Sequence, residues 1–389
     1  MRRKTWLGSA VVAALMLATA ACSSSTSSPG ANDSTNGSAS DDASISVQQG
    51  PGGLGEAKQI TKEASTFPTS FGNAIPKLPS KPPTGKTVVF LQCEQQSCPN
   101  QGKGISAAAA LVGWNVKTLN WKQSDPASIV TALKTALQYH PVAVMFSGAP
   151  EETWSSMKAA YQAAGALIMP SSLPVTPTGP GVLPGHAFEA DEADLGQLLA
   201  AQTAVADNGA GGTALVVTVP SYTVYGPVTA TFKTEFKRFC SSCSSTELDV
   251  TLQQLQAGGL GQAVISQVKR NPAIKYIVSV NGSFTAQLPQ ALQAAGLTGK
   301  YTLITGKGGS QDQQNVLDGK QLSTVNGPFV EGGWQDMDEA IRHVMGLPIP
   351  AEDHRARPRL LTKDNIGTPQ ESFDVPANYE ALFKQIWGF

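Results

Sequence analysis

Residues 86–121 read KTVVFLQCEQQSCPNQGKGISAAAALVGWNVKTLNW, and this stretch decides the fold class. The unbroken apolar run within residues 87–92 is typical of a strand buried on both faces, as in a parallel sheet covered by helices. A polar turn, a small-residue helix closing on Gly113 and a second strand follow. Ligands of open α/β sheets bind beyond the carboxyl ends of the strands, so we expect residues 92–96 to face a cleft.

The same strand–helix unit recurs along the rest of the chain. Helices are predicted at 125–140, 151–164, 192–207, 228–239, 260–270, 284–295, 311–317 and 331–345. Between them lie predicted strands at 142–146, 166–169, 213–219, 247–252, 276–280, 301–305 and 322–325. This alternation predicts βαβ units and parallel sheets. Two sheets suit two doubly wound α/β lobes better than one very large sheet.

Length and charge narrow the class of protein. A chain of 389 residues is long enough for two domains with their own cores. Lys and Arg number 28 against 29 Asp and Glu, which gives a net charge of −1. A nucleic-acid binder carries a basic patch or stripe, and none is evident, so we expect no nucleic-acid partner.

The N-terminus is typical of an exported, lipid-anchored protein. A basic start is followed by an apolar run too short for a confident membrane span, and small residues then lead to Cys22. This resembles the lipidation box of bacterial lipoproteins, with Thr19 where that box usually carries Leu. We therefore expect a signal peptide at 1–21 and lipidation of Cys22; a plain signal peptide with a chance cysteine is the alternative.

Residues 22–84 are predicted to be a lipid-anchored, flexible Ser/Gly/Pro-rich tether. The part up to residue 50 has almost no apolar content, so it cannot offset the entropy cost of ordering. The following part is richer in Pro, and we expect it to be extended along the folded domain.

The remaining four cysteines fall in two close pairs, Cys93 with Cys98 and Cys240 with Cys243. In an exported chain these pairs predict two local disulfides. A four-cysteine zinc site is an alternative, but the pairs lie far apart in sequence. A redox Cys-x-x-Cys motif needs a helix N-terminus, whereas Cys240 follows a predicted helix.

Over about residues 85–388 the chain resembles type I periplasmic binding proteins, in the branch of ribose-like sugar-binding proteins of ABC importers. The stretches that carry the resemblance are 104–114, 191–196, 276–281, 291–299 (ALQAAGLTG), 318–320, 359–366 (RLLTKDNI) and 379–388 (YEALFKQIWG). The resemblance implies two doubly wound parallel-sheet lobes joined by a three-strand hinge, with a ligand held between them.

The resemblance also implies the lobe boundaries. Residues 85–189 plus 328–357 are expected to form the N-terminal lobe, and 190–327 plus 358–389 the C-terminal lobe and tail. The chain would cross between lobes near residues 188–191, 326–329 and 358–362.

The chain departs from its sugar-binding relatives at the ligand site. An Asn-Asp pair of those proteins is Asn281-Gly282 here, and their acidic turn is Gly306-Lys307-Gly308-Gly309. Their helix-opening Arg is replaced by Val228, and their Asp-Arg pair by Ser171-Ser172. Their stacking aromatics give way to about Ser97-Cys98. Charged bidentate groups hold vicinal hydroxyls, so we expect a ligand other than an ordinary monosaccharide. A small, partly apolar or ring-bearing solute with few charges fits better.

The candidate ligand-binding residues are Gln92, Glu94, Gln95, Phe146, Ser147, Ser171, Ser172, Tyr222, Tyr225, Asn281 and Lys307. The two tyrosines follow a strand end and either stack on a ring or pack their own loop. Glu94 and Lys307 are expected to come from opposite lobes. Each then meets a ligand charge, or the two pair across the cleft. A solvated surface position is favoured more for Lys307 than for Glu94.

No motif places a catalytic constellation, and no histidine lies at metal-ligand spacing from another. We therefore expect no enzyme activity, no metal and no cofactor. The interpretation is an extracytoplasmic solute-binding lipoprotein on the outer face of the cytoplasmic membrane, a monomer that delivers a small molecule to an ABC permease. The alternative is a ligand-sensing receptor subunit of the same fold that reports to a signalling partner.

Overall fold

The structure, a computed structural model, describes residues 52–71, 75–349 and 357–389. The predicted signal peptide, Cys22 and the first part of the tether lie outside the described residues. Within the described ranges, no helix is both long enough and apolar enough to cross a membrane.

The first lobe is built on a four-stranded parallel sheet in the order β2-β1-β3-β4. Its strands are β1 (Thr87–Gln92), β2 (Asn115–Asn120), β3 (Ala143–Ser147) and β4 (Leu167–Ser171). Every residue of β3 and β4 is buried, as the continuous apolar runs predict for strands covered on both faces.

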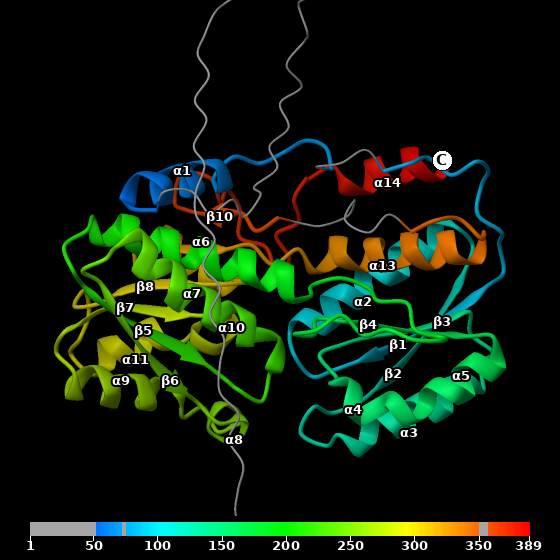
Figure 1. Cartoon of the computed structure of the whole chain (residues 1–389), viewed down its shortest axis with the longest axis horizontal. Helices are drawn as coiled ribbons and strands as arrows, with labels where there is room; N and C mark the ends of the chain where they lie inside the picture. Colours follow the sequence, from blue (N-terminus) through cyan, green and yellow to red (C-terminus); the bar gives the residue numbers. More distant parts are fainter. Residues whose placement is uncertain (1–51, 72–74, 350–356) are drawn as a thin grey trace, which may run out of the picture. The chain divides into compact units, whose positions relative to one another are not determined.

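Helices cover both faces of this sheet (Figure 1). One face packs against α2 (Ser97–Leu111) and α13 (Phe329–Val344), and the other against α3 (Ala127–Leu137), α4 (Glu151–Trp154) and α5 (Lys158–Ala164). The helix predicted at 151–164 is interrupted by a 3-10 turn, η1 (Ser155–Met157). Helices α2 and α13 approach closely, since a Cβ on Gly104 would lie only 2.0 Å from the carbonyl oxygen of Val330.

The second lobe contains a six-stranded sheet in the order β10-β9-β8-β7-β5-β6. All neighbours are parallel except the pair of β10 with β9. The strands are β5 (Thr213–Thr218), β6 (Ser244–Asp249), β7 (Ile274–Ser279), β8 (Thr302–Thr305), β9 (Ser323–Val325) and β10 (Leu360–Leu361).

Helices also surround the second sheet (Figure 1). They are α6 (Glu189–Asp207), the 3-10 turn η2 (Thr223–Tyr225), α7 (Gly226–Phe239), α8 (Leu252–Gln256), α9 (Leu260–Arg270), α10 (Gly282–Thr285), α11 (Leu288–Ala294) and α12 (Ser310–Leu317). The two doubly wound parallel-sheet lobes confirm the predicted fold class. Both predicted disulfides are present, with Cα–Cα distances of 5.6 Å for Cys93–Cys98 and 5.2 Å for Cys240–Cys243.

The chain passes between the lobes more often than the three expected crossings. It leaves β4 for α6, returns from β9 to α13, and goes back from α13 to β10, with residues 350–356 of that last connection outside the described ranges. After β10 it returns once more, because α14 (Tyr379–Trp387) contributes Phe383 and Trp387 to the core of the first lobe. The tail therefore accompanies the first lobe and not, as expected, the second.

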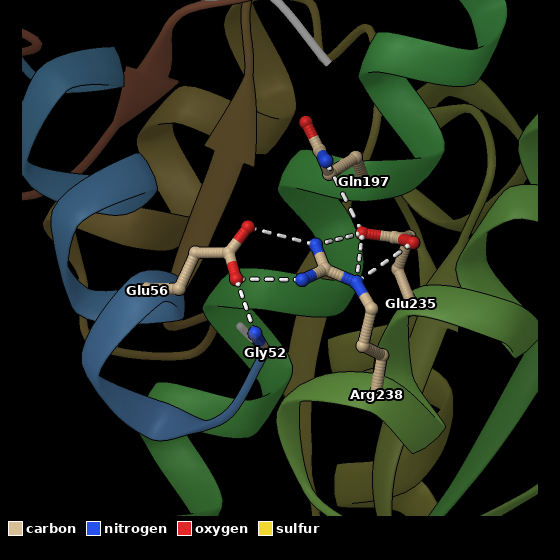
Figure 2. A network of polar contacts seen from close by, with 5 residues as sticks. All are labelled: Gly52, Glu56, Gln197, Glu235 and Arg238. Carbon is tan, nitrogen blue, oxygen red and sulfur yellow. Dashed lines mark hydrogen bonds and ion pairs between the residues drawn. The ribbon is translucent and has the colours of Figure 1, made fainter. Parts of the chain in front are cut away.

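The described part of the predicted tether lies along the folded domain, but it is not extended throughout. Residues Leu54–Ala64 form helix α1, which buries Ala57, Thr61 and Ala64 and packs on α6 of the second lobe. Figure 2 shows how it is fixed: the Arg238 guanidinium donates to both oxygens of Glu56, at 2.6 and 2.9 Å, and also to Glu235. Glu56 in turn accepts from the backbone N–H of Gly52.

The segment after α1 continues onto the first lobe. Phe67 still packs on Phe373, in a cluster with Val316 of α12 and Leu361 of β10. Phe71 packs on Phe383 of the first lobe, with ring centroids 4.9 Å apart. Beyond the gap at 72–74, Leu78 is buried and its N–H donates to the carbonyl of Ile386 at 2.9 Å. Residues 52–71 and 75–84, which we call the strap, therefore contact both lobes.

Candidate functional site

A cavity of about 120 Å³ lies where the carboxyl ends of the strands of both sheets meet the crossings. Residues directly after β1, β3, β4 and β8 line it, together with the loop after β5 and the crossing residues Asn326 and Pro358. One water needs about 10–15 Å³ measured this way, so the cavity has room for a small organic molecule. This is the position that doubly wound sheets offer a ligand.

The structure brings part of the predicted site together. The residues that line the cavity are Gln95, Ser147, Ser172, Tyr222, Tyr225 and Lys307, with Cys93 and Cys98 beside them. Those that do not line it are Gln92, Glu94, Phe146, Ser171 and Asn281. Phe146 points into the core against Trp154, with ring centroids 5.7 Å apart.

The first-lobe wall is a chain of hydrogen bonds centred on Asp336 of α13. Ser147 donates to Oε1 of Gln101 at 2.6 Å, and Nε2 of Gln101 donates to Asp336 at 2.7 Å. The other oxygen of Asp336 lies 2.8 Å from Nδ1 of His186 and 3.3 Å from the hydroxyl of Ser171. Burial disfavours the charged imidazole, but Asp336 outweighs it and raises the pKa of His186.

The second-lobe wall is organised by an ion pair between Lys307, after β8, and Glu192 at the start of α6. The Glu192 side chain is fully buried and that of Lys307 is 18% exposed. Burial raises the pKa of Glu192 although Lys307 opposes the rise, and Glu192 raises the pKa of Lys307 against the effect of burial. Gly306 and Gly308 flank the lysine because a Cβ there would lie 2.5 Å from the carbonyl of Val280 and 2.1 Å from the hydroxyl of Thr324.

Two tyrosines complete this wall. The Lys307 ammonium lies 5.7 Å from the ring centroid of Tyr225, whose hydroxyl accepts from Nδ2 of Asn281. Tyr222 stacks on Phe284 at 5.6 Å, and burial raises the pKa of Tyr222 to about 12. Both rings thus pack within their lobe and also border the cavity, so the two interpretations of these residues do not exclude each other.

Asn281 has a positioning role in this arrangement. Its Oδ1 accepts from the N–H of Ser283 at 2.9 Å, which makes it the N-cap of α10. With its oxygen used in the cap, its amide nitrogen donates to Tyr225. Asn281 therefore fixes a tyrosine at the cavity without lining the cavity itself.

The expectations for the charged groups need correction. Glu94 does not pair with Lys307 across the cleft; its carboxylate accepts from the backbone N–H of Gln123 in its own lobe at 3.1 Å. Lys307 is not solvated but paired with Glu192. The cleft also holds more charged groups than the sequence indicated, since Asp191, Glu192 and Glu331 line it.

Further residues at the cavity, which the sequence analysis did not name as ligand-binding candidates, include Gln101, His186, Asp191, Glu192, Leu195, Phe329, Glu331 and Gln335. The sequence offered one signal for Glu331 and Gln335. Glu331 and Gln335 are four residues apart at the start of a helix that directly follows a predicted crossing, so they share one helical face near the hinge. Burial raises the pKa of Glu331 well above its usual range.

Within the described part of the chain, one group has the spacing of metal ligands: Asp207 with Cys240 and Cys243. The two sulfurs are joined in a disulfide, and Asp207 accepts from the backbone N–H groups of Gly211 and Gly212 at 2.8 and 3.0 Å. The donors are therefore already used in holding this turn.

Residues 95–347 match the family described as periplasmic binding protein domain. No curated protein matches the chain by sequence.

Solved structures share the fold at low identity. An ABC sugar transporter subunit from Rhodobacter sphaeroides 2.4.1 is 18% identical, with a TM-score of 0.61 over 72% of this chain and 99% of that one. The 5-methylthioribose transporter solute-binding protein from Thermotoga lettingae TMO, in complex with 5-methylthioribose, is 16% identical, with a TM-score of 0.63 over 77% and 97%. A periplasmic solute-binding protein from Actinobacillus succinogenes 130z with bound D-allose is 12% identical, with a TM-score of 0.63 over 73% and 99%.

Two α/β lobes with a cavity between their strand ends are the architecture of a periplasmic binding protein. The chain belongs to the periplasmic binding protein family, whose match covers most of the two-lobed part.

Proposed function

We propose that this protein captures a small solute between its lobes outside the cell and delivers it to an ABC permease. The observation that supports this most is one cavity lined by side chains of both lobes and of the crossings. A ligand there contacts both lobes at once, so it favours the closed arrangement by its differential contacts. We further propose that lipidated Cys22 anchors the protein, as a monomer, to the outer face of the cytoplasmic membrane.

The charges at the cavity support a solute without negative charge. Both basic side chains that line it, among the described residues, already pair with buried carboxylates: Lys307 with Glu192 and His186 with Asp336. Asp191 adds an acidic group to the same lining. An anionic solute would therefore find no unpaired cationic side chain in the described lining of the cavity. Burying its charge without a partner costs binding free energy.

The apolar part of the lining supports a ring-bearing, partly apolar solute rather than an ordinary monosaccharide. Tyr222, Tyr225 and Phe329 offer aromatic surface, and Leu195 and Val224 lie among them. Contact with an aromatic face contributes about 0.5–1.5 kcal/mol beyond area burial. The amides of Gln95, Gln101 and Gln335 can then orient the polar groups of such a ring.

Native mass spectrometry of the purified protein, followed by a thermal-shift screen, tests this proposal. A ligand that binds only the folded state at 100 times its Kd adds about 2.7 kcal/mol, so a hit is readable whatever its chemistry. We expect a rise in melting temperature with an uncharged or cationic cyclic compound, and none with common hexoses or pentoses. A clear rise with ribose, xylose or a sugar phosphate would contradict the proposed ligand class.

The anchor has its own test. Cys22→Ser removes the acyl acceptor, so we expect the variant to incorporate no labelled palmitate and to leave the membrane fraction. Cys240→Ser, a cysteine of the second lobe, is the matched control and keeps the label. Equal labelling of wild type and Cys22→Ser would reject lipidation at this residue.

A further inference from the structure

Residues 93–98 form a short loop that is closed on itself by the Cys93–Cys98 disulfide, between β1 and the first turn of α2. Both cysteines are buried and both line the cavity. A loop of restricted length therefore carries the side chains of Glu94, Gln95 and Gln96, of which Gln95 lines the cavity. We call residues 93–98 the disulfide loop.

Contacts within the first lobe hold one side of this loop. The Glu94 carboxylate accepts from the N–H of Gln123, with its two oxygens at 3.2 and 3.1 Å. Nε2 of Gln95 donates to Oε1 of the same Gln123 at 2.9 Å. The disulfide and Gln123 together fix the loop on its own lobe.

The other side of the loop reaches the second lobe. The Gln96 amide donates to Glu371, and the other oxygen of Glu371 accepts from Ser310 at the start of α12. The approach is close, because a Cβ placed on Gly309 would lie 3.1 Å from Nε2 of Gln96. Gln95 also faces the second lobe, because it lines the cavity together with Tyr222, after β5.

Residues 370–371 belong to this second-lobe surface rather than to the first lobe. The N–H of Gln370 donates to Oε1 of Gln313 at 2.8 Å, and Nε2 of Gln313 donates back to the carbonyl of Gln370 at 2.8 Å. Gln313 lies in α12, so Glu371 carries the contact of Gln96 to the second lobe.

We propose that the disulfide loop is a latch: it positions Gln95 and Gln96 so that the first lobe holds the second lobe closed over the bound solute. The disulfide closes the loop covalently, and the side chains of Gln95 and Gln96 face the second lobe. The inference rests on the proposed function only in taking closure as the step that captures the solute.

Hydrogen–deuterium exchange on the purified, disulfide-intact protein tests the latch whatever the solute is. The readout is exchange in peptides covering 219–226 and 308–312, which belong to the second lobe. Losing the hydrogen bond of Gln96 to Glu371 changes an opening equilibrium by roughly 2- to 12-fold. We therefore expect exchange in both peptides to be faster by that factor in Cys93→Ser/Cys98→Ser.

The matched control is Cys240→Ser/Cys243→Ser, which removes the other short disulfide at a place away from the cavity. It should leave both peptides at the wild-type rate. Gln95→Ala/Gln96→Ala keeps the disulfide and removes only the bridging amides, so it should reproduce the faster exchange with an unchanged loop. This variant keeps the test decisive if the serine variant fails to fold.

If peptides 219–226 and 308–312 of Gln95→Ala/Gln96→Ala exchanged at the wild-type rate, the latch proposal would be wrong. Equal acceleration by both cysteine double variants would also overturn it, since that result indicates general destabilisation. These outcomes are independent of the solute screen. A failed screen with accelerated exchange rejects the ligand class and supports the latch. A successful screen with unchanged exchange supports the ligand class and rejects the latch.

Discussion

Lys307 has a positive φ of 45°, which non-glycine residues seldom adopt, and its ammonium is directed to a buried carboxylate. The flanking glycines allow the close packing of the turn, and Glu192 together with the ring of Tyr225 receives the charge. The lysine is thus part of the wall of the site, and we expect it not to serve as an anion receptor.

We expect Lys307→Met to destabilise the fold by about 3–5 kcal/mol, because it leaves the Glu192 carboxylate buried without its partner. Chemical denaturation followed by circular dichroism measures this loss. The double variant Glu192→Gln/Lys307→Met should recover most of it, since no buried charge remains. Equal destabilisation by the single and double variants would show that the ion pair is not the cause.

A second expectation concerns Glu339, which is buried in α13 away from the cavity lining. Burial, with Asp336 and Asp338 nearby, raises the pKa of Glu339 well above 4.5. A raised pKa in the folded state means that stability is present at low pH and is lost as pH rises. Relative to Glu339→Gln, wild type should lose about 1.4 kcal/mol per pH unit above about 4.5, until the folded-state pKa is reached.

Urea denaturation of both proteins between pH 4 and pH 8 measures this difference. A difference between wild type and Glu339→Gln that does not change with pH would contradict the assignment.

Single residues were the least predictable level of the site. Tyr222, Tyr225 and Lys307 were predicted because they follow strand ends, a position that topology places at the cavity. Asp336 was not, because it acts from inside α13 through Gln101 and His186, which are distant in sequence. Pairing between residues so far apart leaves no local pattern.

At the level of elements, the strap shows where local sequence was misleading. Helix α1 follows Gly- and Pro-rich residues, and its buried face consists of the small residues Ala57, Thr61 and Ala64. A face of this size gives a weak periodic signal, and the helix is stabilised by docking on α6 and by Arg238. Most strands, in contrast, were predicted nearly to their bounds because continuous apolar runs identify them. The polar strand β6 was predicted three residues too late, and the two-residue strand β10 was not predicted.

The strap should contribute measurably to stability. Glu56→Ala removes the bidentate partner of Arg238, in a site where both side chains are mostly buried, at 18% and 22% exposed. We expect a loss of about 1–2 kcal/mol in the free energy of unfolding, from charge-assisted hydrogen bonds. Glu63→Ala, on the exposed face of the same helix, should change it by less than about 0.5 kcal/mol. Equal effects of the two variants would show that the contact between Glu56 and Arg238 does not stabilise the strap.

At the level of the whole molecule, alternation of strands and helices was enough to predict two lobes and a site at their strand ends. The number of crossings was not predictable in this way, since the return of α14 and the strap depends on tertiary packing of Phe71, Phe383 and Trp387. A fold with these additional connections still leaves the cavity bordered by both lobes.

The central claim is that both lobes enclose one solute. A crystal structure with the compound that most raises the melting temperature tests it most directly. We predict density for that compound between Gln101 of the first lobe and Tyr225 of the second, with polar contacts to both lobes. A compound bound elsewhere, or touching one lobe alone, would contradict the claim.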